Sequence, residues 1–210
     1  MNIFAQALGR QLGRPRGIFG LLVAQAMATA NRRVISQTIA KIGIDQDSHV
    51  LDLGCGGGEA LALLIEAAPL GEIHGIDHSP LMIARAANAN PRAHVTLGSF
   101  ASLPYPDDSF DRIVAINVAY FWDDAETVVA ELRRVLRPDG ILGVYCTLAR
   151  HLDSIGLGSS GTHRLWNAAD MAILLGHDTC IHKVDAAPDI RGFIAISRLH
   201  ESKMPSSTRR

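Results

Sequence analysis

The sequence is poor in cysteine, in aromatic side chains and, over its first 44 residues, in acidic side chains. Its three cysteines, Cys55, Cys146 and Cys180, are scattered over 210 residues without a CxxC pair or a cysteine–histidine cluster at ligand spacing. This pattern excludes a disulfide framework and a structural zinc site, and it indicates a reducing compartment. We therefore predict a cytoplasmic protein that holds no metal.

Long hydrophobic runs are also missing. The most apolar stretch, residues 18–30, follows several arginines and ends in an A-x-A sequence typical of a secretory cleavage site, but Gln25 interrupts it and it is too short to span a bilayer. Apolar residues instead recur every three or four positions from Leu22 through Val34 to Ile39. This spacing predicts an amphipathic helix, which we favour over a signal peptide. No membrane span is expected.

The formal net charge of −1 conceals an asymmetry between the two ends of the chain. No acidic residue precedes Asp45, and six basic residues give that stretch a charge of +6 against −7 for the remainder. The acidic remainder argues against nucleic-acid binding by the chain as a whole. The basic stretch leaves open a docking face for an anionic partner, and its lack of acids favours an anionic or electron-rich ligand.

From residue 49 onward, short apolar strands alternate with helical patterns, which predicts a doubly wound α/β fold with a mostly parallel sheet and helices on both faces. The predicted strands cover residues 49–54, 72–77, 93–98, 111–118, 141–147, 179–185 and 191–199, and the predicted helices cover 59–68, 80–90, 125–136 and 166–176. Residues 137–140 (RPDG) are predicted to form a turn, and residues 148–165 a loop or lid. The length suits one domain. We divide it into a helical cap over residues 1–44, a core over 45–200 and a flexible tail over 201–210.

The loop after the first predicted strand is the most informative segment. It reads Asp52-Leu53-Gly54-Cys55-Gly56-Gly57-Gly58, and in parallel sheets ligands bind at the carboxyl ends of the strands. Glycines allow the backbone to turn sharply and approach a ligand closely. A dinucleotide fingerprint would need glycine where Glu59 stands, and no phosphate-binding P-loop sequence is present. A nicotinamide-dependent dehydrogenase is therefore the weakest enzyme alternative.

This loop and the segments that follow it resemble the class I S-adenosylmethionine-dependent methyltransferases, in particular their type 11, small-molecule branch. The matching segments are the glycine loop, Asp77 at the end of the second strand, residues 97–100 (LGSF), 103–111 (LPYPDDSFD), Asn117 and 132–142 (LRRVLRPDGIL). The resemblance implies a Rossmann-like, seven-stranded sheet whose last strand is antiparallel. It also implies that S-adenosylmethionine is the cofactor.

The resemblance carries over to particular residues. The implied cofactor contacts are Asp52, Gly54, Cys55, Gly56, Asp77, His78, Met82, Ser99, Phe100 and Asn117. Asp77 stands where the family binds the ribose hydroxyls, and a carboxylate is suited to accept from both hydroxyls of a diol. Ser99 departs from the family, which often has an acid there to accept from the adenine amino group.

The acceptor is predicted to be a small molecule. Asn117-Val118-Ala119-Tyr120 lacks both prolines of the motif found in enzymes that methylate exocyclic amino groups. Past the fourth strand, Tyr120, Phe121 and Trp122 either wall the acceptor pocket or pack a helix on the sheet. The candidate bases are His151, which is also a candidate acceptor contact, His163, His177, Tyr120 and Tyr145.

Two alternative functions stay open at this stage, because both would share the motifs. One is an RNA or protein methyltransferase that docks through the basic segment, and the other is a non-catalytic partner subunit that binds the same cofactor. We expect a monomer or a homodimer, and no nucleic-acid partner.

Overall fold

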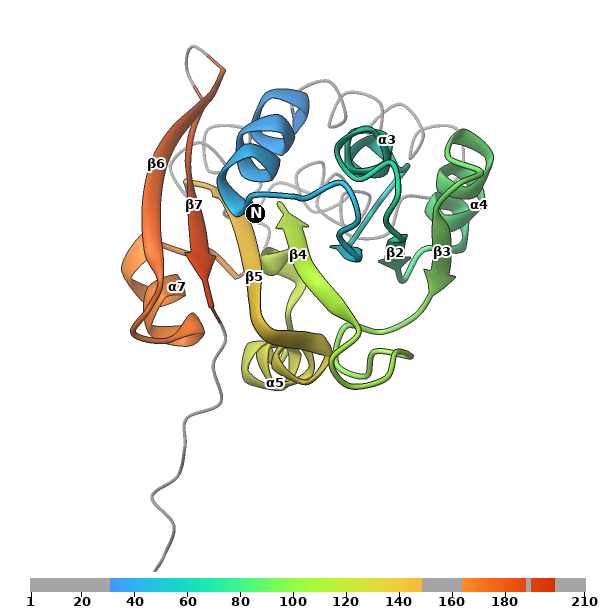
Figure 1. Ribbon diagram of the computed structural model, residues 1–210. Coiled ribbons are helices and arrows are strands. Elements are labelled where there is room, and N and C mark those ends of the chain that lie inside the picture. Colours follow the sequence, from blue (N-terminus) through green and yellow to red (C-terminus); the bar gives the residue numbers. More distant parts are fainter. Residues whose placement is uncertain (1–30, 149–163, 188–189, 199–210) are drawn as a thin grey trace, which may run out of the picture.

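The protein is described from a computed structural model, which places residues 31–148, 164–187 and 190–198. Its strands form one seven-stranded sheet in the order β3-β2-β1-β4-β5-β7-β6 (Figure 1). The strands are β1 (Val50–Leu53), β2 (Ile73–Asp77), β3 (His94–Leu97), β4 (Phe110–Ile116), β5 (Leu136–Thr147), β6 (Cys180–Ala187) and β7 (Ile190–Ser197). The helices are that over residues 31–42, α3 (Glu59–Ala67), α4 (Pro80–Ala89), the short η1 (Ala119–Phe121), α5 (Ala125–Val135) and α7 (Ala168–Leu175).

The sheet is parallel except for β7, which runs antiparallel to both β5 and β6. The helix over residues 31–42, α3 and α4 cover one face, and α5 and α7 cover the other (Figure 1). All four residues of β1 are buried, with Val50 packed among the first group of helices and Leu51 and Leu53 in the opposite core. The predicted doubly wound fold, its seven strands and its antiparallel last strand are therefore confirmed.

The helix over residues 31–42 packs on the sheet as its apolar spacing predicts. Val34 and Thr38 are fully buried, and Val34 forms a small core cluster with Tyr145 of β5 and Ile194 of β7. Gly143 of β5 has no side chain where the helix crosses it, since a Cβ there would lie 2.7 Å from Ile42. Residues 1–30 of the predicted helical cap and the predicted tail over residues 201–210 lie outside the described residues. None of the described helices is long and apolar enough to cross a membrane.

One predicted turn is wrong. Residues 137–140 do not separate α5 from a strand that starts at Ile141, because β5 already begins at Leu136, which pairs with Phe110. The register then shifts, so that Ile141 pairs with Arg112, and Asp139 adopts a positive φ of 65° within the irregular stretch. The strand starts early because Leu136 pairs with Phe110, a residue distant in the sequence, and the side chain of Leu136 is 4% exposed.

Candidate functional site

The carboxyl ends of β1, β2, β4 and β5 lie at one edge of the sheet because these strands are parallel. The glycine loop follows β1 at this edge. Gly54, Gly56 and Gly58 have φ angles of 77°, 53° and 93°, in the left-handed region that favours glycine. The amides of Gly54 and Cys55 donate to the carbonyl oxygen of Ile76 at 2.8 and 3.1 Å, which fixes the start of the loop against β2.

The three glycines differ in their surroundings. A Cβ on Gly54 would lie 2.4 Å from Val118 Cγ2, and a Cβ on Gly58 would lie 2.3 Å from Asn90 Nδ2. A Cβ on Gly56 would meet no atom of the described chain within 4 Å. Gly54 and Gly58 thus allow the neighbouring segments to close on the loop, whereas Gly56 leaves its backbone open to a ligand.

Asp77 joins the segments around this loop. It is the last residue of β2 and 8% exposed; its Oδ2 accepts from Gly56 N at 3.1 Å and its Oδ1 from Ser79 N at 2.8 Å. Its carbonyl oxygen accepts from Gly98 N at 3.0 Å, which brings the segment after β3 alongside. A carboxylate has about four lone-pair sites, so Asp77 can still accept hydrogen bonds from a bound diol.

Asp52 lies beneath the loop, in the third position of β1. It is 2% exposed, and its Oδ2 is buried without a hydrogen-bond partner among the described residues. Burial, together with the nearby charges of Asp77 and Glu59, raises the pKa of Asp52 from its usual 3.8 to about 8. A buried carboxyl group with an unpaired oxygen lowers the stability of the ligand-free protein. A cationic ligand bound beside it would stabilise the charged carboxylate.

This environment predicts an unusual pH dependence of stability. Because the folded protein keeps a proton on Asp52 that the unfolded chain releases above pH 3.8, the free energy of unfolding should fall by a few kcal/mol as the pH rises from about 4 to about 8. Asp52→Asn should remove this slope. Urea unfolding of both proteins at pH 5 and pH 8 measures the difference.

The comparison between the two proteins is needed because another group titrates in the same window with the opposite sign. Burial lowers the pKa of His74, so its contribution to stability is lost as the pH falls below about 6.5. This contribution is common to wild type and Asp52→Asn and cancels in the difference. Parallel pH profiles for the two proteins would contradict the assignment of Asp52.

Four further predicted cofactor contacts follow β2 and β3, and two of them, Ser99 and Phe100, belong to the segment predicted to contact adenine. His78 and Phe100 lie edge to face with ring centroids 6.0 Å apart. Phe100 and Met82 are 8% and 3% exposed, so each contributes chiefly to the core. Ser99 Oγ accepts from Ala101 N at 3.2 Å. Cys55, in the glycine loop, is buried, and burial raises the pKa of its thiol, which disfavours the reactive thiolate.

Asn117, just past β4, is the centre of a polar network that the sequence did not reveal. Its φ is 54°, its Oδ1 accepts from the Tyr120 hydroxyl at 2.9 Å and from both Thr147 N and Thr147 Oγ1 at 3.2 Å. Its Nδ2 donates to Asn31 Oδ1 at 2.8 Å. Tyr145 adds its hydroxyl, 3.2 Å from Thr147 Oγ1. The network joins the ends of β4 and β5 to the first residue of the helix over residues 31–42.

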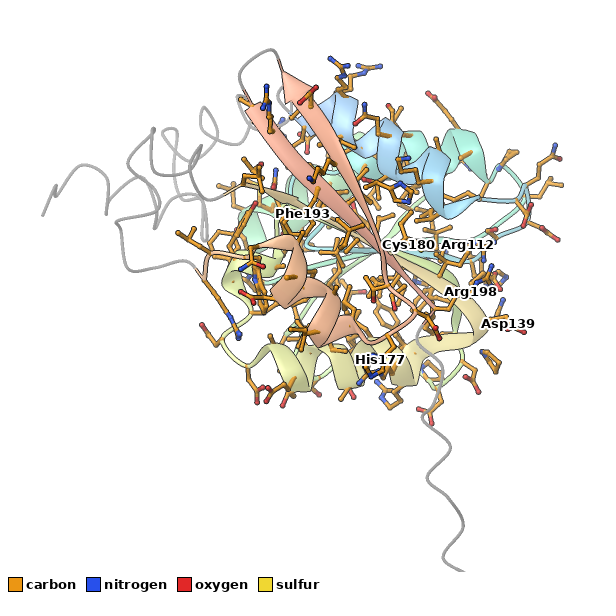
Figure 2. All side chains as sticks on the ribbon, turned by 90° about the vertical axis from the view of Figure 1, so that its left-hand side faces the viewer. Arg112, Asp139, His177, Cys180, Phe193 and Arg198 are labelled. Carbon is orange, nitrogen blue, oxygen red and sulfur yellow. The ribbon has the colours of Figure 1, made fainter. Side chains whose placement is uncertain are left out.

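Of the predicted bases that the structure describes, Tyr120 and Tyr145 lie at this edge and His177 does not. Burial raises the pKa of Tyr120 well above its ordinary value and raises that of Tyr145, so both keep their protons at neutral pH and neither acts as a base. His177 follows α7 at the opposite end of the sheet, on the side of Asp139 and Arg198 (Figure 2). His151 and His163 lie outside the described residues.

The three aromatic residues past β4, Tyr120, Phe121 and Trp122, differ in their burial and contacts. Trp122 is 1% exposed and belongs to the large core between the sheet and α5, so the structure supports its packing interpretation and not a pocket wall. Tyr120 is 6% exposed and engaged in the Asn117 network. Phe121 is half-buried and lies edge to face with Tyr120, with ring centroids 6.4 Å apart. Phe121 is thus the member of the group with the most accessible side chain.

Comparison with known proteins agrees with this geometry. The type 11 family model, described as a methyltransferase domain, matches residues 51–144, from β1 to the middle of β5. The matched part of the chain, residues 51–144, is a type 11 class I methyltransferase domain.

Two of the curated relatives are longer than this chain. It is 34% identical over 119 residues to trans-aconitate 2-methyltransferase of Delftia acidovorans, covering 56% of this chain and 44% of that enzyme. It is 39% identical over 96 residues to malonyl-[acyl-carrier protein] O-methyltransferase of Halorhodospira halophila, covering 44% and 32%. The chain therefore spans less than half the length of these curated relatives.

A solved structure matches more of the chain. A methyltransferase from Haloferax volcanii, in complex with the Trm112 methyltransferase activator, superposes with a TM-score of 0.73 at 18% identity, covering 84% of this chain and 94% of that one. At this identity the likeness concerns the fold.

The edge formed by the glycine loop and Asp77 fits the cofactor that the methyltransferase domain family implies. S-adenosylmethionine carries a positive charge and a ribose diol, and the edge offers the unpaired Oδ2 of Asp52 and the carboxylate of Asp77. Gly56 provides a backbone position with open space above it. No cluster of metal-ligating side chains is found in the described ranges.

Proposed function

We propose that this methyltransferase transfers a methyl group from S-adenosylmethionine to a small-molecule acceptor. Asp77 is the observation that carries the proposal, because one carboxylate orders both the glycine loop and the start of α4 and still has lone pairs for a diol. When bound, the cofactor supplies a methyl group on a positively charged sulfur, which a nucleophile displaces in line.

The residues of this chain would bind and align the reactants. Asp52 is assigned to the cationic part of the cofactor, Asp77 to the ribose hydroxyls, and Phe100 with Ser99 to the adenine ring. Alignment of two reactants can contribute about 7 to 11 kcal/mol to lowering a barrier, so a base is required only for an acceptor that must lose a proton. Tyr120 keeps its proton and fixes the orientation of Asn117 at the end of β4.

We favour an acceptor that carries a carboxylate. The names of the two relatives above give trans-aconitate and malonyl-[acyl-carrier protein] as their substrates, and both substrates carry a carboxyl group. In this chain Asn31 is hydrogen-bonded to Asn117 at the site edge, and the next two residues, Arg32 and Arg33, are exposed. Exposed cations beside a site attract anionic ligands.

Two measurements test the proposal. Calorimetry should show binding of S-adenosylhomocysteine and none of NAD. Transfer of a radiolabelled methyl group should then occur to members of a panel of di- and tricarboxylic acids, and not to total RNA or denatured cell protein. Binding of NAD in place of S-adenosylhomocysteine would contradict the cofactor assignment. Labelling of RNA or protein without labelling of any small acid would contradict the acceptor class.

A further inference from the structure

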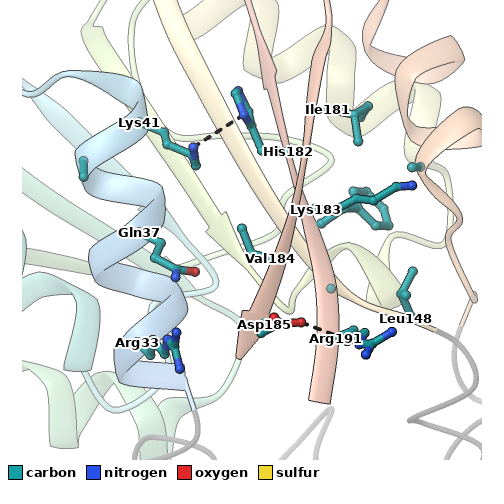
Figure 3. A pocket seen from close by; sticks show the side chains of 14 residues that line it. Arg33, Gln37, Lys41, Leu148, Ile181, His182, Lys183, Val184, Asp185 and Arg191 are labelled. Atoms are coloured by element: carbon teal, nitrogen blue, oxygen red, sulfur yellow. Dashed lines mark hydrogen bonds and ion pairs between the residues drawn. The ribbon is translucent and has the colours of Figure 1, made fainter. Parts of the chain in front are cut away.

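A groove lies between the helix over residues 31–42 and β6, the last strand of the sheet (Figure 3). Its volume is about 1210 Å³. Arg33, Gln37 and Lys41 line it from the helix, and His182 and Val184 line it from the facing side of β6. We call it the β6 groove.

The groove extends around the free edge of β6 to the other face of the strand. There its lining combines charged residues with the apolar Ile181, Leu148, Ala168 and Phe193. The charged residues on this side are Lys183, Asp185 and Arg191, because Asp185 lies two residues after Lys183 on the same face of β6 and pairs with Arg191 (Figure 3). The edge of β6 therefore lies in a slot that has a polar, basic wall on the helix side and a wall of apolar and charged residues on the other.

The groove concentrates positive charge in a chain whose net charge is −1. Four of its lining residues are cationic, namely Arg33, Lys41, Lys183 and Arg191, against the single acid Asp185. Asp185 Oδ1 lies 3.7 Å from Arg191 Nε. The other three cations have no ion-pair partner within the part of the chain that the structure places, and Lys41 Nζ contacts His182 Nδ1 at 3.4 Å. An anionic occupant would neutralise this excess.

The edge of β6 also has main-chain groups available for pairing. Leu148 N donates to Arg191 O at 2.9 Å, so Arg191 directs its main-chain groups to β5 and the next residue, Gly192, directs its groups to β6. Gly192 is paired with Val184, which therefore faces β7. Main-chain groups alternate along a strand, so Lys183 points its N–H and C=O away from the sheet. No strand of the described ranges lies beyond β6.

We propose that the β6 groove docks an extended, acidic segment of a partner protein, which adds a strand to β6. Strand addition satisfies the free main-chain groups, and alternate side chains of the added strand face the two walls. A small anion would use the charges and leave the strand edge unpaired, and so would the phosphates of RNA. The proposal does not depend on which acceptor the methyltransferase uses.

The spacing of the basic wall specifies the segment. Arg33, Gln37 and Lys41 follow one another at intervals of four residues, so Arg33 and Lys41 are separated by about 12 Å along the helix axis. This distance equals about four residues of extended chain. The segment should therefore carry acids at positions i and i+4, with a donor at i+2 opposite Gln37, whose Oε1 is buried without a partner among the described residues. Apolar residues at i+1 and i+3 would face the other wall.

The test uses a fluorescein-labelled peptide with the core Glu-Val-Ser-Val-Glu and the full-length protein. Fluorescence anisotropy at low salt should show saturable binding. Two control peptides should bind at least tenfold more weakly. One has a scrambled core of the same composition, Glu-Glu-Ser-Val-Val, and the other has a core of opposite charge, Lys-Val-Ser-Val-Lys. On addition of the ordered peptide, hydrogen exchange of the Lys183 amide should slow.

Variants separate charge from strand pairing. The double variant Arg33→Gln and Lys41→Gln should weaken binding by about tenfold, which corresponds to about 1.4 kcal/mol. The control variant Arg92→Gln with Arg198→Gln removes two exposed cations elsewhere and should leave binding unchanged. Lys183→Pro removes an outward N–H at an edge position where proline is tolerated and should abolish binding, whereas Lys183→Gln should keep it within threefold.

Three outcomes would overturn the proposal. Equal affinity for the ordered and scrambled peptides would exclude strand addition. An unchanged exchange rate of the Lys183 amide would do the same, and this readout serves if Lys183→Pro does not fold. Binding of a ten-nucleotide RNA in the absence of peptide binding would assign the groove to nucleic acid.

Discussion

Replacing Asp77 with alanine is expected to weaken binding of S-adenosylhomocysteine by about ten- to a hundredfold, or about 1.4 to 2.8 kcal/mol. The loss has two sources in the structure. The variant lacks the acceptor assigned to the ribose hydroxyls. It also loses the hydrogen bonds that the Asp77 carboxylate accepts from Gly56 N at 3.1 Å and from Ser79 N at 2.8 Å. Calorimetric titration with S-adenosylhomocysteine measures the effect.

Asp111→Ala is the matched control. Asp111 is the second residue of β4, where it accepts from His49 N at 2.8 Å and pairs with Arg137 at 2.9 Å. These partners lower its pKa, although partial burial opposes them. Its removal should therefore cost stability while leaving cofactor affinity unchanged. Equal affinities of wild type and Asp77→Ala would reject the role of Asp77, and an equal loss in both variants would indicate a general effect of lower stability.

The fold and the position of the cofactor edge could be predicted from the sequence because both depend on local patterns. Buried strands read as short, mainly apolar segments, as in Val50 to Leu53, and the glycines that the loop needs stand close together in the chain. Asp77 ends the second such segment, and the resemblance to the methyltransferase family predicts its role. Residues 137–140 (RPDG) are predicted as a turn because proline and glycine normally interrupt a strand. The structure places them in β5, and the pairing of Leu136 with Phe110 that extends this strand is not local in the sequence.

The Asn117 network could not be predicted for the same reason. Asn31 and Thr147 are 86 and 30 residues away from Asn117 in the chain, and neither lies in a recognisable motif. The pairing of β4 with β5 brings Thr147 to Asn117, and the packing of the helix over residues 31–42 on β5 and β7 adds Asn31. The burial of Trp122 is also a tertiary effect, because its place just past a strand is compatible with either a pocket wall or the core.

The largest loss of stability is expected from Gly54→Ala. At φ 77° an alanine costs about 1 to 2 kcal/mol, and its Cβ would lie 2.4 Å from Val118 Cγ2, an overlap that adds about 1 to 3 kcal/mol. A total of about 3 kcal/mol should lower the midpoint of thermal unfolding by about 10 °C. The same variant should bind S-adenosylhomocysteine poorly, because Gly54 begins the loop. Thermal unfolding followed by circular dichroism measures the shift.

Gly56→Ala distinguishes the two purposes of the alternating glycines. Its φ of 53° carries a comparable backbone strain, but its Cβ would meet no atom of the described chain within 4 Å, so the unfolding midpoint should fall by only about 3 °C. Its affinity for S-adenosylhomocysteine should nevertheless fall by at least tenfold, because the methyl group occupies the space assigned to the ligand. Adding Val118→Ala to Gly54→Ala should recover part of the lost stability, as contacting residues are coupled. If Gly56→Ala kept full affinity, the open side of the loop would not be the cofactor side.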